Sequence, residues 1–182
     1  MLRAFSNEVA FGSLMRGWAL AHQGQVEEGI EQITQGLRAY RATGAVIFQP
    51  YILALLAEAQ GIMGQPEAGL MALAEALTLV DTTGERWYQS ELYRLRGAFL
   101  LQLSADNQRE AEACFQHAIT IAQSQGAKAW ELRTTTSRAR LWQQQGKRDE
   151  AWQVLAEAYN WFTEGFDTVD LQEAKALLAD LA

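Results

Sequence analysis

Gly24-Gln25-Val26-Glu27-Glu28-Gly29 recurs along this chain in altered form. Two further copies are Gly64-Gln65-Pro66-Glu67-Ala68-Gly69 and Gly146-Lys147-Arg148-Asp149-Glu150-Ala151, and a fourth, Asn107-Gln108-Arg109-Glu110-Ala111, has lost its glycine. The last residues of the four copies lie 40, 42 and 40 positions apart. Self-similarity at this period indicates stacked supersecondary units, because one helical hairpin cannot bury its apolar face without a neighbour.

Each unit is predicted to be two antiparallel helices that meet at this repeated sequence. The periodicity places first helices at about 5–23, 47–63, 86–104 and 127–145, second helices at about 26–42, 66–82, 107–124 and 147–163, and a last helix at about 168–181. Glycine follows each second helix, where a helix C-terminus favours a left-handed residue: Gly44, Gly84, Gly126 and Gly165. The sequence therefore predicts an all-α chain forming one domain over 1–182, with repeats at about 5–44, 47–84, 86–126 and 127–165 and a capping helix at about 168–181.

Small residues recur at equivalent points of these helices. Gly17 and Gly97 lie within first helices, and Gly29 and Gly69 begin second helices. Because a glycine inside a helix costs about 1 kcal/mol relative to alanine, it needs a compensating reason. We expect a close approach of paired helices at these points.

The order of small, large and small residues around a Gly-x-x-x-Glu-Ala turn resembles the tetratricopeptide repeat (TPR) over nearly the whole chain. This resemblance implies a right-handed α-solenoid of about four TPR-like hairpins. Two segments, Glu85-Arg86-Trp87-Tyr88 through Gly97 and Gly146 through Thr168, are similar to the C-terminal TPR region of multidomain bacterial proteins. Those proteins join a signalling ATPase to a class III adenylate or guanylate cyclase or to a DNA-binding regulator. The likeness implies a non-catalytic sensing and assembly arm.

In TPR proteins the first helices line a concave groove, so the resemblance implies a partner-binding site along them. The residues at those positions are Phe11, Leu14, Trp18, His22, Tyr51, Ala54, Glu58, Ile62, Glu91, Arg94, Ala98, Gln102, Arg133, Thr136, Arg140 and Gln143. In this order the groove changes from aromatic and apolar through acidic to basic, which suits an extended peptide or a partner helix. The alternative is that Glu58, Glu91 and Arg94 pair with one another on a solvated helix face.

Tryptophan is unusually frequent, with six residues. Most of them are expected to pack between repeats, because large rings supply much buried area in a thin solenoid. Trp18 is the one expected to contact a partner. Cys114 and His117 are three apart on one predicted helix, but zinc needs more ligands than this pair supplies, so a packing cysteine beside a surface histidine is expected.

Other classes of function are disfavoured by composition and by the motifs. The formal net charge of −7 argues against nucleic-acid binding. No assembled nucleophile, base and oxyanion donor and no phosphate-binding loop are recognisable, so we expect no enzymatic activity, cofactor or metal. A single cysteine, no export signal and no apolar stretch long enough for a bilayer predict a cytoplasmic protein without a membrane partner.

Three hypotheses for function follow. The first is a receptor for a protein or peptide partner that uses the groove. The second is a structural arm that forms a homodimer through an exposed terminal repeat, where Phe5, Val9 and Phe11 lack a polar cap. The third is a small-molecule sensor that regulates an attached ATPase or cyclase.

Overall fold

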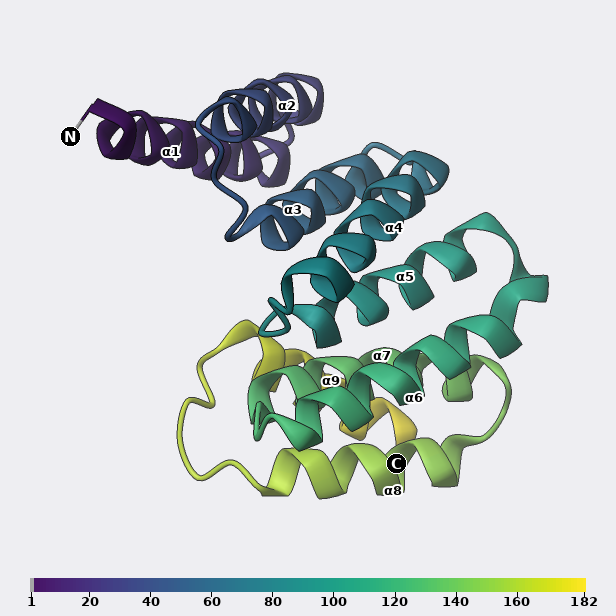
Figure 1. Cartoon of the computed structure of the whole chain (residues 1–182). Helices are drawn as coiled ribbons and strands as arrows, with labels where there is room; N and C mark the ends of the chain where they lie inside the picture. Colours follow the sequence, from purple (N-terminus) through teal and green to yellow (C-terminus); the bar gives the residue numbers. More distant parts are fainter. Residues whose placement is uncertain (1) are drawn as a thin grey trace. The chain divides into compact units, whose positions relative to one another are not determined.

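The computed structural model describes the backbone of residues 2–182 and the side chains of residues 8–182, and this part of the chain contains helices and no strand (Figure 1). It divides into two compact units, residues 1–88 and 89–182. The first unit holds α1 (Leu2–His22), α2 (Val26–Ala42), α3 (Gln49–Ile62) and α4 (Pro66–Thr83). The second holds α5 (Gln89–Leu103), a short 3₁₀ helix η1 (Ala105–Asn107), α6 (Gln108–Ser124), α7 (Lys128–Gln144), α8 (Arg148–Asn160) and α9 (Val169–Leu181).

The helices pair into the predicted hairpins (Figure 1). α1 packs along α2 and α3 along α4 in the first unit, and α5 packs along α6 and α7 along α8 in the second. Within each unit the first helices also contact one another, α1 with α3 and α5 with α7. The predicted all-helical class and its helix boundaries are confirmed to within a few residues.

Glycines in the left-handed conformation follow helices both inside the hairpins and between consecutive hairpins. The predicted positions after second helices have positive φ, as in Gly84 at 75° and Gly165 at 76°. The turns inside the first, second and fourth hairpins also contain such a glycine, with φ of 89° at Gly24, 75° at Gly64 and 78° at Gly146. The third hairpin lacks that glycine and makes its turn through η1, where Ser104 Oγ accepts a hydrogen bond from the backbone N–H of Asp106 at 3.1 Å.

The predicted close approach of α1 and α2 occurs at Gly17 and Gly29. A Cβ on Gly29 would lie 2.6 Å from the carbonyl oxygen of Gly17 and 2.8 Å from the backbone nitrogen of Ala21. At Gly97 the contact is with a side chain, since a Cβ would lie 2.6 Å from the ring of Phe115. Backbone contacts therefore set the distance between α1 and α2, whereas the ring of Phe115 packs between α5 and α6.

α9 closes the second unit by packing against both α7 and α8. The sequence spacing of this helix predicts an apolar stripe of Leu171, Ala174, Leu178 and Leu181. The structure buries Leu177 in this stripe and leaves Leu178 half-buried, so the stripe is turned slightly from the expected position. With Leu132 and Leu155 these residues form one continuous core.

Half of the tryptophans, most of which were expected to pack between repeats, keep a large exposed fraction. Trp87, Trp152 and Trp161 are 40%, 44% and 58% exposed. Trp87 and Trp161 lie at helix ends, next to loops, where helices cover less of each ring. Phe5, expected at an exposed end, lies outside the residues whose side chains are described.

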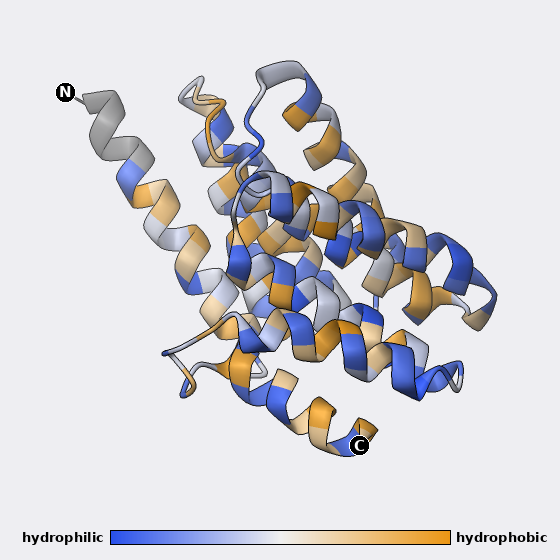
Figure 2. Ribbon diagram, turned by 90° about the horizontal axis from the view of Figure 1, so that it is seen from below, coloured by the Kyte–Doolittle hydropathy of each residue, from blue (hydrophilic) through white to orange (hydrophobic). Residues whose placement is uncertain are grey.

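Apolar and polar residues interleave along the helices (Figure 2). In the described part of the chain, no helix combines the length and the apolar character required to cross a bilayer.

Candidate protein-interaction surface

Residues at equivalent positions of neighbouring first helices meet one another. The rings of Phe11 and Tyr51 stack with centroids 6.5 Å apart. The indole Nε1 of Trp18 donates a hydrogen bond to Glu58 Oε2 at 2.7 Å. Each of these two pairs joins positions 40 residues apart. Since both pairs join α1 to α3, the predicted residues of the first unit share one face of this helix pair.

An aromatic surface forms at one end of this face. It comprises Phe11, Phe48, Tyr51 and Trp87. Phe48 contacts both Phe11 and Trp87 with ring centroids 6.0 Å apart, and Tyr51 contacts Trp87 at 5.4 Å. Phe48 and Trp87 were not among the predicted site residues, because they lie in the connections that precede α3 and α5 rather than on a helix face. The apolar run Val46-Ile47-Phe48 after Gly44 is the sequence signal that could have found them.

Trp18 and His22 form the other end of the same face. Their rings lie 4.1 Å apart, and His22 Nδ1 is 3.0 Å from the carbonyl oxygen of Trp18. Trp18 is half-buried and His22 is exposed. The acceptor Glu58 holds the indole in place, so Trp18 presents a fixed ring at the surface rather than a free one.

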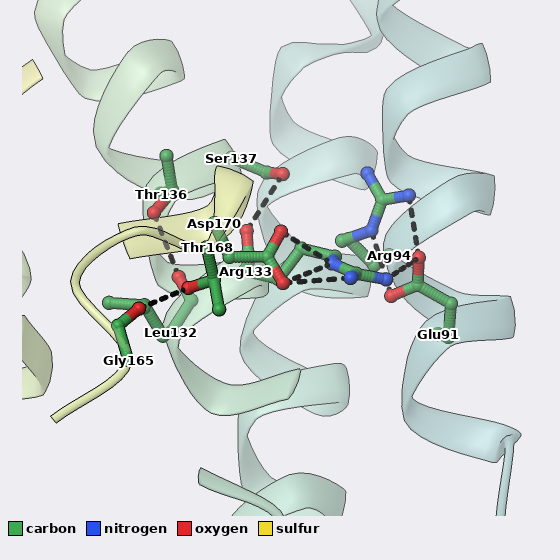
Figure 3. A network of polar contacts seen from close by, with 9 residues as sticks. All are labelled: Glu91, Arg94, Leu132, Arg133, Thr136, Ser137, Gly165, Thr168 and Asp170. Carbon is green, nitrogen blue, oxygen red and sulfur yellow. Dashed lines mark hydrogen bonds and ion pairs between the residues drawn. The ribbon is translucent and has the colours of Figure 1, made fainter. Parts of the chain in front are cut away.

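In the second unit, the predicted site residues Glu91, Arg94 and Arg133 form a charge network (Figure 3). Glu91 is fully buried, and its two carboxylate oxygens accept hydrogen bonds from Arg94 Nε at 2.9 Å and Nη2 at 2.7 Å. Arg133 of α7 lies 3.4 Å from the same carboxylate. Arg133 also binds Asp170 of α9 through Nε at 3.0 Å and Nη2 at 2.7 Å. The network therefore ties α5, α7 and α9 together.

The carboxylates around Arg133 stabilise its charged form. Burial by itself disfavours the charged guanidinium, but the hydrogen bonds and charges of Asp170 and Glu91 outweigh that effect and raise the pKa of Arg133 above its ordinary value. About two helical turns farther along α7, Arg140 Nη2 binds Glu173 of α9 at 2.7 Å.

These contacts correct the expected charge gradient. Arg133 and Arg140 were predicted to form a basic end of the groove, but α9 places the carboxylates of Asp170 and Glu173 on them. Asp170 and Glu173 were absent from the predicted site. Asp170 lies 37 residues after Arg133, close to the repeat period, so a search for a fifth first helix could have found it.

Four predicted lining residues are core residues instead. Leu14, Ala54 and Glu91 are 0% exposed and Thr136 is 4% exposed. Leu14, Ala54 and Thr136 each come three positions after the first lining residue of their helix. At about 100° per residue, a step of three places them about 60° to one side of that residue, toward the paired second helix. Arg94 at the same step is half-buried, and Gln143, farther along α7, is half-buried as well.

Asp170→Asn is expected to lower the free energy of unfolding of the second unit by about 1 kcal/mol, because the half-exposed ion pair with Arg133 loses its charge. Glu173→Gln is the matched control on the same helix. It should change stability by less than about 0.5 kcal/mol, because both partners of the Arg140 pair are 49% exposed. Urea unfolding at low salt measures both, and equal effects would contradict the distinction.

Metal ligands do not gather among the described residues. No group of three His, Cys, Asp or Glu side chains there could hold a metal ion. Cys114 is buried, and desolvation raises the pKa of its thiol, while His117 packs edge-on against Tyr93 with centroids 4.4 Å apart. A cleft of about 210 Å³ in the second unit is lined by side chains of α6, α7 and α8, among them Lys128 and Arg138, and by Trp161, which follows α8.

No protein-family model and no curated protein matches this sequence. Solved structures do match: a putative kinesin light chain of Podosopora anserina, with nearly identical TPR-like repeats, superposes with a TM-score of 0.72 and 16% identity over 96% of this chain and 86% of that one. A substituted form of the same protein gives a TM-score of 0.73 and 15% identity over 96% and 85% of the two chains. At this identity the likeness concerns the fold alone, and it shows that the chain is an α-solenoid of TPR-like helical hairpins.

Proposed function

We propose that this chain is a non-catalytic scaffold that binds a partner polypeptide through the exposed side of its first helices, with residues 1–182 acting as one repeat domain. The observation that carries the proposal is the aromatic surface of the first unit, where Phe48 and Trp87 remain 42% and 40% exposed. Contiguous exposed rings on a folded chain mark interaction sites, because water contact with them is unfavourable. His22 and Ile62 extend the exposed part of this face to the far ends of α1 and α3.

Site-specific photo-crosslinking in the producing cells tests this function. Ile62 on α3 and Met71 on α4 are a matched pair, since both are apolar and exposed, at 48% and 75%, on opposite helices of one hairpin. A photoreactive residue at 62 or at 22 is expected to capture a partner, and one at 71 is expected to capture none. Equal capture at 62 and 71, or capture at 71 alone, would contradict the proposal.

The proposal extends to the larger protein in which this scaffold acts, a bacterial signalling protein. The resemblance of the segments around Arg86–Gly97 and Gly146–Thr168 supports a cytoplasmic sensing and assembly arm of a signalling ATPase or cyclase protein. Sequencing the upstream coding region tests it directly. A reading frame that continues into an ATPase or cyclase domain is expected, and an unrelated upstream gene would overturn this setting.

A small-molecule sensor is supported less well. The charged cleft of the second unit, at about 210 Å³, is smaller than the roughly 300 Å³ or more that is usual for ligand pockets. A larger cleft of about 490 Å³ in the first unit is wide open, whereas small-molecule pockets enclose most of their ligand. A homodimer through the first repeat is opposed by charge, because each copy carries a formal net charge of −7. Sedimentation across a range of concentrations should therefore give a monomer.

A further inference from the structure

The loop before α3 holds a residue in an unfavourable conformation. Phe48 has φ 67° and ψ −2°, and among the described residues it is the one non-glycine with positive φ. The left-handed region is disfavoured for a large side chain, because its Cβ crowds the backbone. Such a conformation persists only where the surroundings enforce it, and it is concentrated at functional sites.

The enforcing group is Glu85. Both of its carboxylate oxygens accept the backbone N–H of Phe48, at 2.8 and 2.9 Å, and Oε1 also accepts the indole N–H of Trp87 at 2.8 Å. On the other side of the loop, Tyr40 donates its hydroxyl to the carbonyl oxygen of Ile47 at 2.7 Å. Hydrogen bonds thus fix a loop whose apolar side chains point outward, with Ile47 61% exposed.

An apolar cleft lies beside this loop. It measures about 490 Å³ and is lined by Phe11, Gly12, Tyr40 and Phe48, with Glu8 at its edge. A Cβ on Gly12 would meet nothing within 4 Å, so the cleft is open above α1. Its size falls in the range of binding pockets, and its walls suit a large apolar side chain.

Carboxylates surround the aromatic surface. Burial and the charge of Glu85 raise the pKa of Tyr40, and burial and the charge of Glu58 raise the pKa of Tyr51. Glu8 lies at the cleft itself. The first unit as a whole is also acidic, since its 88 residues contain nine acidic and five basic side chains. A negative rim around exposed rings attracts cations, both through the carboxylates and through the ring faces.

We propose that the aromatic surface and its cleft dock a partner segment that carries one large apolar side chain flanked by lysine or arginine. The apolar side chain enters the cleft between Phe11 and Phe48, and the flanking cations face Glu8 and the rings of Tyr51 and Trp87. This proposal rests on the proposed scaffold function and specifies its partner chemistry. A second copy of the chain is disfavoured as the occupant, because its formal net charge of −7 repels the acidic rim.

The test uses the full chain and two fluorescent peptides of equal length. Each has a central tryptophan, and the flanking residues are two lysines on either side in one peptide and two glutamates in the other. Fluorescence anisotropy at low salt should show the lysine peptide binding at least tenfold more tightly than the glutamate peptide, with an affinity that falls as salt is added. Equal binding, tighter binding of the glutamate peptide, or no binding by either peptide would overturn the proposal.

Three variants locate the site. Phe48→Asn is expected to weaken the lysine peptide at least tenfold and to leave the melting temperature nearly unchanged, because asparagine tolerates the left-handed conformation that phenylalanine resists. Glu8→Lys, at an exposed residue, should weaken the lysine peptide without unfolding the chain. Trp152→Ala removes a ring that is 44% exposed on α8, and it should have no effect.

The outcomes separate this proposal from the broader function. Unchanged binding by both Phe48→Asn and Glu8→Lys would place the peptide elsewhere and overturn the docking proposal. If residue 62 still captured a partner in cells, the scaffold function would stand without it. Self-association that Phe48→Asn abolishes would show a second copy to be the occupant and would also overturn the proposal.

Discussion

Arg94→Met is expected to lower the free energy of unfolding of the second unit by about 3 kcal/mol. Arg94 donates to both oxygens of Glu91, whose side chain is fully buried. Removing the guanidinium leaves a buried carboxylate with only the longer contact to Arg133 at 3.4 Å. The cost arises from the uncompensated buried charge more than from the lost attraction. Urea unfolding followed by circular dichroism measures it.

The double variant Glu91→Met with Arg94→Met distinguishes these two sources. Replacing both partners removes the charge that needs compensation, so we expect most of the stability to return. Arg96→Met is the matched control on α5, since its pair with Glu110 has both partners more than 40% exposed and should contribute less than about 1 kcal/mol. A double variant as unstable as Arg94→Met alone would show that the ion pair itself, rather than the lone charge, matters.

Gly29→Ala is expected to lower stability by about 2–4 kcal/mol, although alanine is the better helix former. The added methyl would lie 2.6 Å from the carbonyl oxygen of Gly17 and 2.8 Å from the amide nitrogen of Ala21. Both contacts are with backbone, which cannot turn aside as a side chain can. α1 and α2 must therefore separate along their length, and thermal unfolding of the first unit should begin earlier.

Gly12→Ala in the same hairpin provides the control. Its added methyl meets nothing within 4 Å, so only the helix propensity changes and the variant should be more stable by about 0.5–1 kcal/mol. The opposite signs at two helical glycines are the essential result. If Gly29→Ala were also stabilising, the hairpin could not be as closely spaced as described.

The repeat period was sufficient to predict the helices, because glycine turns and apolar spacing are local signals. The same period predicted which residues meet across first helices, as Trp18 does with Glu58. It could not predict burial at Leu14 and Thr136. The lining positions were chosen from the first helix alone, without regard to which of its sides the paired second helix covers. Phe48 and Asp170 were missed because neither lies on a first helix of a repeat. Phe48 lies in a strained loop, and Asp170 lies on α9, outside the repeats.

The function of the predicted groove residues stays a prediction. The structure brings Phe11, Trp18, His22, Tyr51 and Glu58 onto one face of the first unit. It also shows that Arg94 and Arg133 hold a buried carboxylate, so that reversing their charges would disturb the fold. Binding experiments are therefore better placed on exposed residues such as Glu8 and Ile62.

Cys114 offers a built-in reporter of motion. It is the single thiol of the chain, it lies on α6, and it is only 7% exposed with a raised pKa. A thiol reagent can reach it only when the helices around α6 open, because both access and ionisation are suppressed in the closed state. The rate of labelling under native conditions therefore measures how often the second unit opens locally. No engineered probe is needed, and the first unit contributes no signal because it has no cysteine.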